Sequence, residues 1–93
     1  MTTGWTQEEA IEYECACECI TDLMGIKTAE ICEEEAKPFP DTTHVARLRA
    51  ERFELAQERK RLHADNHAEI ARINKEYGAI VRAAYARQEA IPA

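Results

Sequence analysis

The sequence has few of the residues that interrupt helices or build catalytic pockets. Among its 93 residues there are three glycines, three prolines and no serine, and aromatic side chains make up only 6%. This scarcity of glycine and proline excludes a flexible linker and a collagen-like or low-complexity chain. No run of about 18 apolar residues is present, so we expect no membrane-spanning segment. Residues 1–5 have neither the basic region nor the apolar stretch of a secretory signal, and we therefore expect a cytoplasmic protein.

The residues that are present predict one small helical domain. Apolar side chains make up 45% of the chain and charged ones 32%, and the mean hydropathy is −0.53. A chain of 93 residues is long enough for one domain but not for two. We therefore expect a single all-α domain over residues 1–93, which divides into an acidic helical hairpin (1–37), a proline-containing connector (38–41) and a long helix (42–93).

The start of the hairpin carries a clear helix signal. Thr6 is a good N-cap, and Glu9 stands three residues later, which is the pattern of a capping box. Gly25 is the kind of residue that ends a helix in a left-handed conformation. The sequence thus predicts a first helix over about 6–24.

A second, shorter helix is predicted after this glycine. Thr28 is able to cap a helix over about 28–37, and Pro38 and Pro40 end it, because the residue before a proline avoids the helical region. We expect Phe39, between the two prolines, to fill the gap between the elements.

A long amphipathic helix is predicted over about 42–90. Its apolar residues fall in one sector and keep a coiled-coil-like heptad spacing, first up to Leu62 and again from Ile70 onward. Such a helix would be about 70 Å long, which exceeds the size of a globule of this length. Either it is continuous and pairs with a second chain, or it breaks near 63–67. We favour the continuous helix because neither glycine nor proline interrupts that stretch, although Asn66 with Glu69 would form a second capping box.

The continuous helix predicts a homodimer whose seam contains both apolar and polar side chains. The seam residues are Leu48, Arg52, Leu55, Arg59, Leu62, Asn66, Ile70, Ile73, Tyr77 and Ile80. Polar groups in such a seam cost stability and set the register or the number of partners. Arg52 and Arg59 either meet glutamates of the acidic hairpin or extend to water at the edge of the seam.

Charge is distributed unevenly along the chain. Residues 1–43 have a net charge of −9 and residues 44–93 a net charge of +3. Acidic side chains gather on one face of the hairpin: Glu8, Glu12, Glu14, Glu18, Asp22, Glu33 and Glu34. Such a face is commonly just solvated, or is paired with the basic half of the same chain or of a second copy. We expect it to bind another protein.

The four cysteines give little support to a metal site. In a helix, Cys15 and Cys19 lie one turn apart and are weak candidate ligands, whereas Cys17 points to the opposite side and Cys32 follows much later. A second cysteine pair is lacking. We therefore expect no metal and no cofactor, with zinc or copper binding by thiolates as a minor alternative.

No sequence motif of a common enzyme class is present. The chain has no glycine-rich phosphate loop and no serine nucleophile, and His63 and His67 lack the intervening glutamate of a zinc protease helix. We expect no enzyme. Direct binding to nucleic acid is not expected either, because seven acidic residues accompany the bases of residues 44–93 and the pI is about 5.0.

In overall profile, which is small, acidic, helical and without a pocket, the chain resembles the small proteins that phages and mobile elements use to block host defence or nucleic-acid machinery. This resemblance implies a regulator or inhibitor that acts by binding a protein. Its acidic face would imitate a phosphate backbone within a basic groove. The alternatives are a structural coiled-coil homo-oligomer or adaptor, and the thiolate metal binder.

Overall fold

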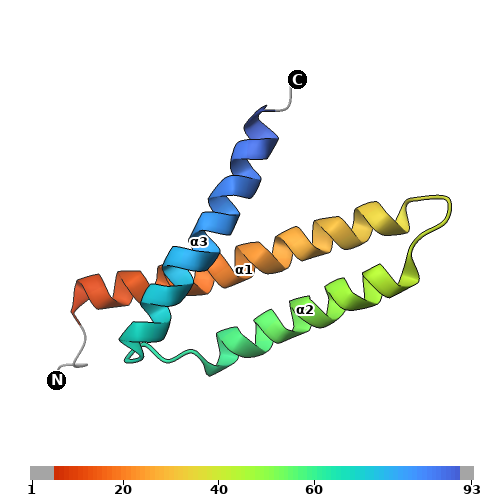
Figure 1. Cartoon of the computed structure of the whole chain (residues 1–93). Coiled ribbons are helices and arrows are strands. Elements are labelled where there is room, and N and C mark those ends of the chain that lie inside the picture. The colour runs from red at the N-terminus through yellow and green to blue at the C-terminus, as the bar shows by residue number, and fades with distance from the viewer. Residues whose placement is uncertain (1–5, 91–93) are drawn as a thin grey trace.

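The structure, a computed structural model, describes residues 6–90, with the backbone alone for residues 88–90. It contains three helices, α1 (Gln7–Glu35), α2 (Thr42–Arg61) and α3 (His67–Ala90), and no strand within the described range (Figure 1). The prediction of an all-α fold is therefore confirmed.

Helix α1 is the central element. It runs beside α2 in the opposite direction and is crossed by α3, whose C-terminal half extends away from the other two helices (Figure 1). No close backbone contact joins α2 to α3 over residues 6–90, so the two helices are brought together only through α1 and through side chains. None of the described helices is both long and apolar enough to cross a lipid bilayer.

The start of α1 is as predicted, but its continuation is not. The Thr6 side chain accepts a hydrogen bond from the Glu9 amide at 3.0 Å, and the Glu9 carboxylate accepts one from the Thr6 amide at 2.8 Å. The predicted break at Gly25 is wrong, since the helix continues through this residue to Glu35. A glycine inside a helix costs only about 1 kcal/mol. Burial of Leu23 before it and Ile31 after it on the same helix outweighs that cost.

The connector after α1 is held by a glutamate rather than by the phenylalanine. Helix α1 ends before Pro38, as expected, but Phe39 is 92% exposed and does not fill a gap between helices. Glu34 is only 9% exposed, and its carboxylate accepts hydrogen bonds from the Asp41 amide and from Lys37 Nζ, both at 2.9 Å. The Asp41 amide and the Lys37 ammonium lower the pKa of Glu34.

Glu34→Gln is expected to lower the melting temperature by a few degrees at pH 7. The amide lacks the charge that strengthens both hydrogen bonds of the connector. Because the pKa of Glu34 is lowered in the folded protein, this stabilisation exists above the ordinary carboxyl range and is lost as the pH falls. The difference in melting temperature between wild type and variant should therefore shrink as the pH is lowered below the ordinary carboxyl value of 4.5. Glu30→Gln, at an exposed carboxylate of the same helix, is the control and should leave the melting temperature unchanged across this pH range.

The predicted continuous helix over 42–90 is interrupted. Helix α2 ends at Arg61, and Leu62 has an extended backbone with φ −71° and ψ 128°. Asn66 begins α3, since its side-chain oxygen accepts a hydrogen bond from the Glu69 amide at 3.3 Å. The break lets α3 turn back onto α1, so that apolar side chains on both sides of it are buried within one chain instead of along a rod.

The core lies where the three helices meet. Its principal cluster draws on all of them: Ala16, Cys17, Ile20, Leu23, Leu55, Leu62, Ile70, Ile73 and Val81. A smaller cluster of Ile31, Val45 and Leu48 joins α1 to α2 near the connector. The two clusters leave the outer side of α1 uncovered.

Candidate protein-binding surface

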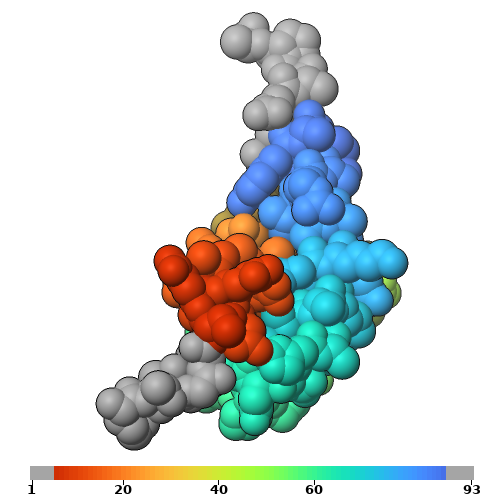
Figure 2. All heavy atoms as spheres, turned by 90° about the vertical axis from the view of Figure 1, so that its left-hand side faces the viewer, coloured from red at the N-terminus to blue at the C-terminus, as the bar shows by residue number. Residues whose placement is uncertain are grey.

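Five of the predicted acidic residues lie together on the outer side of α1. At 100° per residue they fall within a sector of about 120°, opposite the buried Ile20. These residues, which we call the acidic face, are Glu8, Glu14, Glu18, Asp22 and Glu33. Figure 2 shows the first turns of α1 lying uncovered at the surface beside α3.

The acidic face lacks ion pairs in the described part of the chain, although Arg59 lines a shallow hollow together with Glu14 and Glu18. Among the described residues, none of its five carboxylates forms an ion pair. The one basic residue of α1, Lys27, turns toward α2, where its ammonium lies 3.0 Å from the Glu51 carboxylate. Ile11 is 54% exposed on the same side of the helix and gives the face an apolar contact point.

The two remaining predicted acidic residues are placed elsewhere. Glu12 lies at the border with α3, where its backbone carbonyl accepts a hydrogen bond from Asn74 Nδ2 at 3.1 Å, while its side chain stays exposed. Glu34 points to the opposite side of α1 and holds the connector. The acidic face is consequently narrower than the predicted set.

The apolar part of the predicted dimer seam is used inside the monomer. Half of the seam residues are buried by the chain's own helices: Leu48, Leu55, Leu62, Ile70 and Ile73. The heptad spacing correctly indicated that these side chains are buried. The break between α2 and α3 lets them pack against one another and α1 within one chain. A dimer formed along these five side chains would require the monomer to open.

The polar members of the seam have separate roles. Arg52 donates a hydrogen bond to the Thr28 hydroxyl at 3.0 Å instead of meeting a glutamate of α1. Arg59 is exposed, and it lines a shallow hollow together with residues of α1. Asn66 caps α3. The Tyr77 hydroxyl donates to the Glu58 carboxylate at 2.7 Å, and Ile80 remains 52% exposed.

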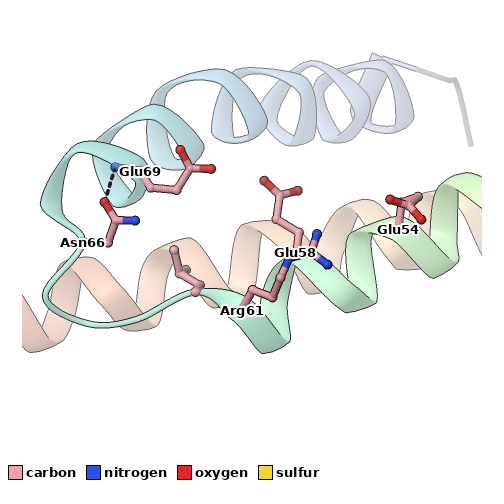
Figure 3. Close-up of a pocket in the computed structure, with 6 residues that line it drawn as sticks. Glu54, Glu58, Arg61, Asn66 and Glu69 are labelled. Carbon is pink, nitrogen blue, oxygen red and sulfur yellow. Dashed lines mark hydrogen bonds between the residues drawn. The ribbon is translucent and has the colours of Figure 1, made fainter.

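An acidic pocket of about 320 Å³ opens at the turn between α2 and α3. Glu54 and Glu58 reach into it from α2 and Glu69 from α3 (Figure 3). The Arg72 guanidinium donates to Glu58 at 2.7 Å and to Glu69 at 2.6 Å. This guanidinium lowers the pKa of Glu69, and Arg72 is itself held firmly protonated. Two of the three carboxylates are therefore engaged in joining the helices.

The cluster around Arg72 was not predicted from the sequence. Part of the cluster has a local sequence signal. Glu69 and Glu76 stand three residues before and four residues after Arg72, which are the spacings at which side chains on one helix meet. The third partner, Glu58, lies on α2 and came within reach only because the chain turns at 62–66.

The cysteines do not converge. Cys17 is buried, Cys15 and Cys32 are exposed, and none of the four cysteines forms a disulfide. Burial raises the pKa of the half-buried Cys19, which makes it a weak nucleophile. No group of three or more His, Cys, Asp or Glu side chains within the described part of the chain is arranged to hold a metal ion.

Comparison with known proteins adds no relative. No protein-family model, no curated protein and no solved structure matches this chain. Any functional assignment therefore depends on the geometry and charge of its surface.

Proposed function

We propose that this protein is a non-enzymatic regulator or inhibitor that binds a basic surface of another protein through the acidic face of α1. The observation that carries the proposal is a set of five carboxylates on one side of a single helix that form no ion pair with the residues that the structure describes. From Glu8 to Glu33 the face extends about 38 Å, at 1.5 Å per residue.

The fold supports this use of α1. The opposite side of the helix is fixed by the core, so the carboxylates are held in place before a partner arrives and little ordering cost remains to be met on binding. A row of like charges also accelerates the encounter with a basic surface, and this effect weakens as salt is added. Ile11 adds an apolar contact that salt does not screen.

The spacing of the charges favours a basic protein surface over close imitation of nucleic acid. Glu14, Glu18 and Asp22 follow one another every four residues, about 6 Å along the helix axis. Phosphates of one DNA strand follow one another every 3.4 Å or so along the axis. The acidic face thus has about half the charge density of a single DNA strand. A basic protein surface that needs only opposite charge fits it better than a groove shaped for the phosphate spacing of DNA.

Charge reversal of the acidic face tests the proposal. We expect Glu14→Lys, Glu18→Lys and Asp22→Lys together to abolish capture of the partner from extracts of the native host, as measured by quantitative mass spectrometry. Far-UV circular dichroism should show an unchanged helix content, because none of these side chains belongs to the core.

A matched pair of double variants separates the acidic face from net charge. Glu14→Lys with Glu18→Lys changes the charge as much as Glu30→Lys with Asp65→Lys, whose positions are exposed but outside the face. Only the first pair should reduce capture strongly. Equal losses in both, or capture that survives the triple reversal, would show that the acidic face is not the binding surface.

A further inference from the structure

An apolar groove remains open between α2 and α3. It has a volume of about 440 Å³, and Leu23, Leu55, Tyr77 and Ile80 contribute its apolar lining. Ile80 is 52% exposed there, so the chain does not close the groove with its own described side chains. The α2 side of the groove is formed by one face of that helix, which includes Ala50.

Two charges at the rim of the groove form no ion pair with any described residue. Glu51 is neutralised by Lys27 at 3.0 Å, and Glu58 is held by Arg72 and Tyr77. Among the described residues that line the groove, Arg47 and Glu54 alone are charged and form no ion pair. They have opposite signs and stand seven residues apart on the same side of α2, about 10 Å along its axis.

We propose that the groove binds a second copy of this chain, with the two α2 helices antiparallel around a twofold axis near Ala50. In a twofold interface each contact occurs twice, with the roles of the two copies exchanged. Arg47 of one copy then faces Glu54 of the other, and the reverse pair forms on the far side of the axis. Both Arg47 and Glu54 of each copy thereby gain an ion-pair partner when two copies associate.

The residues between these two charges suit the arrangement. Ala50 stands midway between Arg47 and Glu54, and its small side chain allows two helices to approach closely. Glu51 lies next to the axis, and its own Lys27 cancels the charge that would otherwise repel its symmetry mate. Association also removes the exposed Ile80 from water.

The dimer leaves the acidic face available. Leu23 and Lys27 line the groove from the core side of α1, whereas the acidic face lies on the outer side of that helix. A dimer would therefore display two acidic faces at once. The inference does not depend on the proposed function, since the two use opposite sides of α1.

Charge exchange across the axis tests the dimer. Wild-type protein should move from monomer to dimer between about 5 and about 300 µM in sedimentation velocity. Arg47→Glu and Glu54→Arg should each weaken association about tenfold or more, because each change replaces two attractive contacts by two repulsive ones. The double variant should regain association, and an equimolar mixture of the two single variants should form a heterodimer. Lys60→Glu, at an exposed α2 position outside the groove, is the control and should not alter association.

Each alternative result has a definite meaning. A wild type that is monomeric at about 300 µM would overturn the proposal and leave the groove to a different protein. A wild-type dimer that both single variants leave intact would show that the copies meet elsewhere. Far-UV circular dichroism of every variant at low concentration excludes loss of folding as the cause of dissociation.

Discussion

Ile20→Ala is expected to lower the free energy of unfolding by about 2 to 5 kcal/mol. The Ile20 side chain is fully buried (0% exposed) in α1, at the point where α2 and α3 both pack on that helix. Truncation removes apolar burial and leaves a cavity, which the neighbouring Leu55 and Ile73 fill only in part. In a domain whose total stability is about 5 to 15 kcal/mol, the midpoint of urea denaturation should fall markedly.

Ile11→Ala provides the matched comparison within the same helix. Ile11 is 54% exposed on the outer side of α1, so its truncation should change the free energy of unfolding by no more than about 0.5 kcal/mol. Equal effects at the two positions would contradict the packing of α2 and α3 on the core side of α1.

The positions of the helix breaks show where sequence patterns lose their predictive value. Glycine commonly ends a helix, yet α1 continues through Gly25. Side chains before and after this glycine are buried against other helices. The stretch 63–67 contains neither glycine nor proline, yet the chain turns there, capped by Asn66. In both places the burial of distant apolar residues decided the outcome, and a local signal reports only a small part of that energy.

Features that depend on nearby residues alone were predicted more accurately. The capping box of Thr6 and Glu9 joins residues three apart, and the structure contains both of its hydrogen bonds. Glu8, Glu14, Glu18 and Asp22 precede Gly25 and share one side of α1, as the helical period predicts. Glu33 lies on the same side only because α1 continues past Gly25. Glu34 is absent from the acidic face because it lies on the opposite side of α1, where its carboxylate accepts a hydrogen bond from the Asp41 amide.

The dimer seam illustrates a different limit. Heptad spacing identified the apolar stripe of α2 and α3, and most of those side chains are indeed buried. Periodicity does not state which molecule covers a stripe, and here the chain itself does so by turning at 62–66. What remains exposed is Ile80 with the groove beside it, and the sequence did not reveal that Arg47 and Glu54 line this groove.

Arg72→Met should weaken the contact between α2 and α3 and lower the free energy of unfolding by about 1 to 2 kcal/mol. The guanidinium of Arg72 joins Glu58 of α2 to Glu69 and Glu76 of α3, and lies 5.4 Å from the centre of the Tyr77 ring. Since no close backbone contact joins the two helices in the described range, this side chain is a principal connection between them. Its loss leaves three carboxylates close together without their cation.

The pH dependence of this variant distinguishes an electrostatic effect from simple loss of packing. Arg72 lowers the pKa of Glu69, so the stabilisation is present above the ordinary carboxyl value of 4.5 and disappears as the pH falls through the lowered value. The wild type should therefore lose its advantage over Arg72→Met progressively as the pH is lowered below 4.5 in urea titrations. Arg82→Met, at an exposed arginine of α3 without an ion pair in the described residues, should change neither the stability nor its pH profile. An advantage that persists undiminished well below pH 4.5 would mean that Arg72 acts through its guanidinium over the Tyr77 ring, and that the carboxylates do not join the two helices.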